Sequence, residues 1–175
     1  MNKPLKIIFL IFTICLLSYV YLPTPAFPDN LRDSLQSNEP ADMEDTFRRG
    51  YYTNLTREEV VAFYKSEFNK SNNFFSYYTL RLNYPPEEAP VLIRDQTKST
   101  FLEEFTHPLR ESLYISGYEP DPNKVKLSSG GKVWRQKVIV RYVPSDIKIR
   151  LVVVLLTLAS IYLLVREYSY AKKQN

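Results

Sequence analysis

Cysteine and histidine are almost absent from this chain. Its 175 residues include one cysteine, Cys15, and one histidine, His107. A single thiol cannot form an intrachain disulfide, and a cysteine-based metal site needs several thiols. One imidazole without thiols nearby also falls short of the three or four protein ligands that zinc usually has. The composition therefore predicts no disulfide, no metal site and no cofactor.

Motifs of catalysis and nucleotide binding are also missing. The glycine-containing segment 128–131 lacks the spacing of a phosphate-binding loop and is expected to be a turn. Glu103 and His107 would share a helix face, but Pro108 follows, and an imidazole at a helix end has a structural explanation. Adjacent carboxylates do not face each other on a helix. Such pairs occur at 58–59, 87–88 and 103–104. We therefore expect no catalytic residues and no enzyme.

Two long apolar runs are present, one near each end. Residues 7–22 contain no charge, and neither do residues 151–165. At 1.5 Å per residue the runs extend about 22–24 Å as helices, slightly less than a ~30 Å hydrocarbon core. Basic residues at their ends can reach water while their methylene groups stay in lipid. The sequence predicts transmembrane helices at 7–22 and 148–166.

Each run has an alternative interpretation. Residues 7–22 have basic residues before them and small residues soon after them, as a cleaved signal peptide does. Residues 151–165 are rich in β-branched side chains and would suit a buried core strand, although fifteen uncharged residues are long for a strand. In either interpretation of the first run, the residues that follow it cross a membrane.

Basic residues outside the two runs predict the orientation. Lys3 and Lys6 favour a cytoplasmic N-terminus at residues 1–6, and the basic tail 167–175 favours a cytoplasmic C-terminus. Basic residues just before the second run oppose this orientation, but long segments cross membranes largely regardless of their charge. We expect a two-pass protein of the cell membrane whose central domain is extracytoplasmic.

The central part begins with a proline-rich segment, residues 23–45, which is expected to be an extended linker. The domain proper is expected at 46–147. Thr56 and Glu59 have the spacing of a capping box, which predicts a helix over 57–68 with Val60, Phe63 and Phe68 on its packed face. Apolar residues four apart predict a second helix over 99–113, kinked at its proline.

Strands are predicted from alternating or β-branched segments. Residues 74–84 alternate and should have one buried face, and residues 133–143 should bury Trp134, Val138, Val140 and Tyr142. Residues 114–118 are expected to begin a strand, 121–131 to form turns, and 91–93 to be a strand or a helix. The predicted fold class is α+β, with a small, mostly antiparallel sheet and two helices between the transmembrane helices.

Charge is unevenly distributed along the domain. Residues 124–150 carry eight basic side chains and one acidic side chain, whereas residues 29–59 carry eight acidic and four basic ones. One expectation is that the two regions complement each other across the fold or are simply solvated. Alternatively, the basic region contacts anionic lipid headgroups or an acidic partner, at about 1 kcal/mol for each basic residue near a charged surface. The candidate contacts are Lys137, Arg141, Lys148 and Arg150.

The expected partners are the lipid bilayer and one or more membrane proteins. Nucleic acid is not expected, because no nucleic-acid-binding module accompanies the basic residues. The leading hypothesis is a non-enzymatic binding or scaffolding protein, a subunit or accessory factor of an envelope complex. One alternative is a sensor that signals through the second transmembrane helix to a partner. Another is a membrane-tethered hydrolase of envelope polymers.

Overall fold

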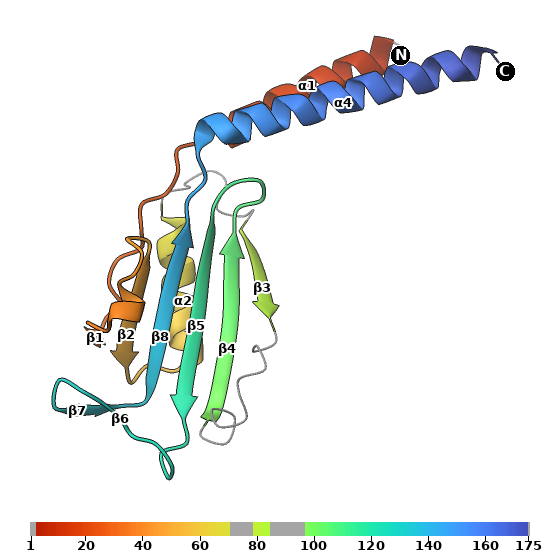
Figure 1. The fold of residues 1–175 in the computed structure, drawn as a ribbon. Coiled ribbons are helices and arrows are strands. Elements are labelled where there is room, and N and C mark those ends of the chain that lie inside the picture. Colours follow the sequence, from red (N-terminus) through yellow and green to blue (C-terminus); the bar gives the residue numbers. More distant parts are fainter. Residues whose placement is uncertain (1–2, 71–78, 85–96, 175) are drawn as a thin grey trace. The chain divides into compact units, whose positions relative to one another are not determined.

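The computed structural model describes residues 3–70, 79–84 and 97–174. The chain divides into two compact units (Figure 1). Residues 25–144 form one unit, the domain. Residues 1–24 and 145–175 form the other, the helical unit.

Two helices form the helical unit: α1 (Lys3–Val20) and α4 (Ile147–Gln174). They run antiparallel, because Val20 at the end of α1 packs against Val154 and Leu158 near the start of α4. Further along, the rings of Phe9 and Tyr162 lie 6.3 Å apart between centroids. Most other large apolar side chains of both helices are exposed. The unit therefore presents an apolar surface that a membrane or a protein partner has to cover.

Of the helices that the structure describes, only α4 is long and apolar enough to span a membrane. Its apolar segment, Ile147–Lys172, has 26 residues and extends about 39 Å. The apolar segment of α1, Pro4–Val20, is shorter. The helical conformation of 151–165 rules out the alternative that these residues form a core strand.

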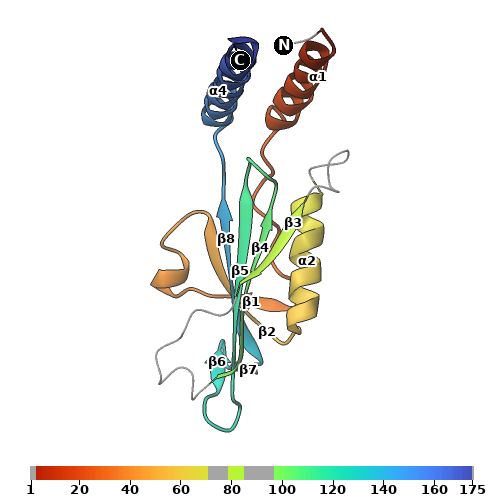
Figure 2. The ribbon, with the colours of Figure 1, turned by 90° about the vertical axis from the view of Figure 1, so that its right-hand side faces the viewer.

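The domain is a six-stranded antiparallel sheet with a helix on one face (Figures 1 and 2). The strand order is β1-β2-β8-β5-β4-β3. Its strands are β1 (Ser34–Gln36), β2 (Arg48–Thr53), β3 (Leu80–Tyr84), β4 (Thr97–Thr106), β5 (Ser112–Pro120) and β8 (Gln136–Val143). A separate two-stranded ribbon, a short 3₁₀ helix and the covering α-helix complete the domain: β6 (Leu127–Ser129) with β7 (Lys132–Trp134), η1 (Pro40–Asp42) and α2 (Arg57–Asn69). The α+β class and the antiparallel sheet are confirmed.

Helix α2 begins where the sequence predicts. The Glu59 backbone N–H donates to Thr56 Oγ1 at 3.3 Å, and the Thr56 N–H donates to Glu59 Oε2 at 2.7 Å. This capping box satisfies two of the N–H groups that a helix start leaves without partners. The buried residues of α2 are Val60, Val61, Tyr64 and Phe68, whereas Phe63 is only partly buried. The packed face was therefore predicted correctly except for the aromatic residue at its centre.

The core lies between α2 and one face of the sheet. Alternate residues of the central strands point toward α2, and they meet in register: Phe105 opposite Leu113, and Ile115 opposite Val140. Gly117 is required beside them, because a Cβ there would lie 2.0 Å from the Phe101 ring. The buried cluster also includes Leu31, Tyr51, Val138 and Tyr142.

The predicted helix over 99–113 is wrong. These residues form most of β4, a turn and the start of β5. Apolar residues four apart fit a helical period of 3.6, but four is also a multiple of the strand period of two. Pro108 lies in the turn, where Leu109 has a φ of +62°. Among the described residues the domain therefore has one α-helix rather than two.

Two strand predictions need correction. The structure describes only 80–84 of the predicted strand 74–84, and Leu80, Leu82 and Tyr84 are exposed on this edge strand, so the predicted buried face is wrong. The strand predicted over 133–143 is divided at residue 135, and Trp134 belongs to the β6–β7 ribbon. Strand β5 confirms the prediction at 114–118, and residues 91–93 lie outside the described residues.

Part of the segment expected to be a linker packs into the domain. Leu31 is buried in the core, and β1 pairs with β2. The Tyr142 hydroxyl donates to the Pro25 carbonyl at 2.9 Å. Residues 25–45 thus contribute an edge strand and core contacts, which proline content does not reveal.

Replacing the helix cap should destabilise the domain. Thr56→Ala removes the acceptor for the Glu59 N–H and should lower the free energy of unfolding by about 1 kcal/mol. Thr56→Ser keeps that acceptor and is the matched control. Urea unfolding of the detergent-solubilised chain, followed by circular dichroism, measures both. Equal stability of the alanine and serine variants would contradict the role of the cap.

Candidate functional site

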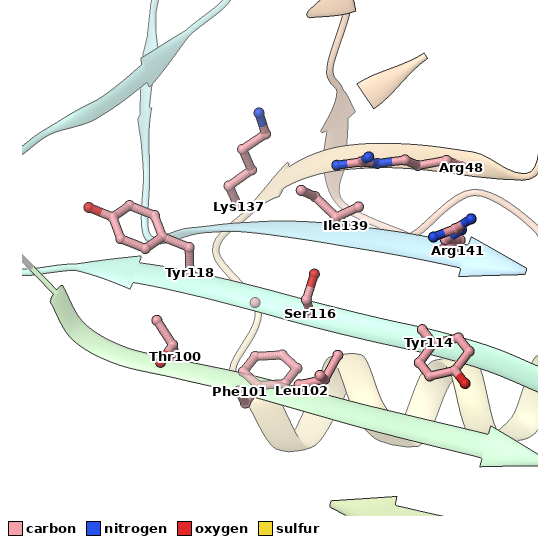
Figure 3. A pocket seen from close by; sticks show the side chains of 11 residues that line it. Arg48, Thr100, Phe101, Leu102, Tyr114, Ser116, Tyr118, Lys137, Ile139 and Arg141 are labelled. Carbon is pink, nitrogen blue, oxygen red and sulfur yellow. The ribbon is translucent and has the colours of Figure 1, made fainter. Parts of the chain in front are cut away.

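The face of the sheet opposite α2 holds a hollow that the described residues line. Because side chains alternate along a strand, the neighbours of core residues project to this face. They enclose about 540 Å³ (Figure 3). The main lining residues are Arg48, Thr100, Leu102, Tyr114, Ser116, Tyr118, Lys137, Ile139 and Arg141. We call this surface the open face.

Two arginines stand side by side at one end of the hollow. Arg48 on β2 is the register partner of Arg141 on β8. Neither arginine forms an ion pair within the described parts of the chain, and the buried Arg48 Nε has no hydrogen-bond partner there. Like charges directly opposite on neighbouring strands are destabilising. The pair is therefore a local concentration of positive charge that no ion pair within the described residues neutralises.

Lys137, the third basic residue of the hollow, is already neutralised. Its Nζ lies 2.8 Å from Glu39 Oε2 and 2.7 Å from Asp42 Oδ2. Burial opposes ionisation of Asp42, but hydrogen bonds from Lys137 and Ser37 outweigh burial and lower the pKa of this carboxyl. Burial likewise opposes the charge of Lys137, yet the two carboxylates raise its pKa overall. Asp42 packs closely against Gly50, because a Cβ added to that glycine would lie 2.6 Å from Asp42 Oδ2.

A carboxylate lies toward the other edge of the open face. The Tyr84 hydroxyl donates to Glu104 Oε2 at 2.6 Å, and this bond raises the pKa of Tyr84 to about 12. Glu104 is buried. The open face is thus basic at β2 and β8 and carries one hydrogen-bonded carboxylate at β4.

Glu103, which precedes Glu104 in β4, points to the face of the sheet that α2 covers. Its carboxylate is fully buried and accepts hydrogen bonds from Arg81 Nε at 2.8 Å, from Arg81 Nη2 at 2.9 Å, and from Arg57. The Arg81 bonds lower the pKa of Glu103 against the effect of burial, and Arg57 adds to this effect. Because Arg57 belongs to α2 and Arg81 to β3, Glu103 links both elements to β4.

His107 lies in a buried hydrogen-bonded cluster and does not pair with Glu103. Its ring stacks on Phe68 with centroids 4.2 Å apart. Its Nδ1 lies 2.8 Å from Glu111 Oε1, and its Nε2 lies 3.0 Å from Thr79 Oγ1. His107 and Glu111 are both buried and do not line the hollow. The dyad considered from sequence is replaced by an internal hydrogen-bonded cluster.

The structure divides the four predicted anionic-surface contacts between the two units. Lys137 and Arg141 line the hollow of the domain. Lys148 and Arg150 belong to α4, where Arg150 is buried and donates to Thr24 Oγ1 at 3.0 Å. Arg48 was missed, because strand β2 was not predicted and its pairing with β8 leaves no local signal.

The described residues contain no group of three or more metal-ligating side chains that would hold an ion. No protein-family model, curated protein or solved structure matches this chain.

The Glu103 link predicts a pH-dependent contribution to stability. A carboxyl whose pKa is lowered on folding stabilises the fold above its unfolded-state pKa, about 4.3, and this stabilisation is lost as the pH falls toward the folded-state pKa. Glu103→Gln should therefore cost about 2 kcal/mol at pH 7. The difference from the unchanged protein should shrink below about pH 4.

Urea unfolding at pH 7 and at pH 3.5 measures this difference. Glu58→Gln, at an exposed position on α2, is the control and should have little effect at either pH. A Glu103→Gln penalty that is as large at pH 3.5 as at pH 7 would contradict an ionised, stabilising Glu103.

Proposed function

We propose that this chain is a membrane-anchored binding protein whose extracytoplasmic domain holds a membrane-protein partner on the open face of its sheet. One observation carries the proposal. The sheet is packed by α2 on one face, and on the other it has a basic and aromatic hollow. A face of this composition, with arginine and tyrosine around a depression, is typical of protein interfaces.

The helical unit supports membrane anchoring. Segment Ile147–Lys172 is long enough to cross a bilayer by itself. The shorter α1 packs against it antiparallel, as two successive passes through one membrane would. The exposed apolar side chains of both helices are suited to lipid. We therefore propose a two-pass arrangement with both termini in the cytoplasm and the domain outside.

The alternatives have weaker support. A hydrolase of envelope polymers would need two carboxyl groups on either side of one bond. Glu103 and Glu104 instead point to opposite faces of the sheet, and Glu103 is buried between two arginines. A sensor that signals through α4 would use the same open face for its ligand, so it differs from the leading proposal only in what binding causes.

Cysteine labelling tests the proposed topology. In a Cys15→Ser background, Ser128→Cys places a thiol at an exposed position of β6, and Lys172→Cys places one near the end of α4. A membrane-impermeant maleimide should label the thiol at position 128 in intact cells, and the thiol at position 172 only after permeabilisation. The reverse pattern would overturn the orientation, and labelling of both in intact cells would overturn the two-pass arrangement.

Blocking the hollow tests the binding role. Ser116 lies at its centre on β5, so Ser116→Trp should fill it and abolish recovery of a stoichiometric membrane partner in mild detergent. Lys65→Trp puts the same side chain on the exposed surface of α2 and should leave recovery unchanged. Recovery of the same partner with both variants, each shown by circular dichroism to be folded, would contradict the use of the open face.

A further inference from the structure

Arg48 and Arg141 form no ion pair with the residues of the domain that the structure describes. Register partners on antiparallel strands have Cα atoms about 4.5–5.5 Å apart, so both guanidinium groups can reach one ligand. Figure 3 shows both side chains at the same end of the hollow. The buried Arg48 Nε has no acceptor in the described residues and requires one from elsewhere.

The other charged groups of the open face are engaged within the domain. Lys137 is held by Glu39 and Asp42. Asp42 feels the charge of Arg48, but the ion pair that its carboxylate forms is with Lys137, at 2.7 Å. Glu104 accepts the Tyr84 hydroxyl. A ligand that enters the hollow therefore meets two arginines as its main unsatisfied charges.

The surroundings of the pair indicate the class of ligand. Leu102, Ile139, Tyr114 and Tyr118 line the same hollow and present apolar and aromatic surface beside the arginines. The hollow crosses β2, β8, β5 and β4, which is wide for a small inorganic anion. An extended peptide with a carboxylate and flanking apolar side chains matches both its charge and its lining. The planar guanidinium group suits a carboxylate, because it can donate two parallel hydrogen bonds.

We infer that Arg48 and Arg141 bind a carboxylate side chain in an acidic, partly apolar segment of the partner protein. The inference rests on the proposed function and specifies the chemistry of the partner.

A peptide titration tests the inference on the full chain in zwitterionic micelles. The probes are acetyl-Leu-Glu-Leu-Glu-Leu-amide and the matched glutamine peptide, and the readout is the NMR signals of the arginine Nε–H groups. The glutamate peptide should shift the signals of Arg48 and Arg141 with saturation, and the glutamine peptide should not. Arg48→Gln and Arg141→Gln should each weaken binding about tenfold or more.

Two control variants separate the site from general charge. Arg49→Gln removes an adjacent arginine that bonds Asn30 and lies over Phe27 on the other face, and it should keep affinity within about twofold. Arg48→Lys keeps the charge but lacks the planar guanidinium group, and it should bind the glutamate peptide more weakly than the unchanged protein does. Equal binding of the two peptides, or unchanged affinity in both glutamine variants, would overturn the inference.

Further results distinguish a lipid from a peptide as the source of the anion, and the failure of the carboxylate inference from the failure of the proposed binding role. Stronger saturation of the Arg48 and Arg141 signals by phosphatidylglycerol added to the micelles than by the peptide would assign the pair to lipid headgroups and reject a peptide ligand. If Ser116→Trp abolishes partner recovery but Arg48→Gln and Arg141→Gln do not, the carboxylate inference fails while the binding role stands. If Ser116→Trp leaves recovery intact, the binding role itself fails.

Discussion

The packing of a single helix against a six-stranded sheet is the constraint on which the domain depends. Val60, Tyr64 and Phe68 of α2 close the hydrophobic core against one face of the central strands. Among the described residues no second α-helix covers the other face, and the segment around η1 borders part of it (Figure 2). The open face therefore has to be compatible with water or with a partner. Its mixture of tyrosine, arginine and short aliphatic surface meets both requirements.

Strand alternation gives neighbouring residues of the same type opposite roles. Glu103 points toward α2 and joins three elements of the core side, whereas Glu104 points to the open face. Arg49 bonds Asn30 on the core side, whereas Arg48 reaches the hollow beside Arg141. The period of two thus separates side chains that stabilise the fold from side chains that are available for binding.

The sequence predicts the features that local chemistry determines. The α2 helix follows from its capping box, and the buried face of β8 follows from alternation. The β4–β5 hairpin was missed, because the spacing of Phe101, Phe105 and Leu109 fits a helix as well as a strand. Lys137 and Arg141 were selected from local charge, but Arg48 joins them only through the pairing of β2 with β8, which are distant in sequence. Such pairing is a property of the whole fold and leaves no local signal.

Site-specific photo-crosslinking in living cells tests most directly whether the open face is the binding surface. A photoreactive amino acid in place of Ile139 would lie in the hollow, and one in place of Lys65 would lie on the exposed surface of α2. A discrete crosslinked membrane protein from position 139, absent from position 65, is the result expected of a partner on the open face. A crosslinked protein from position 65 alone, or none from position 139, would contradict it.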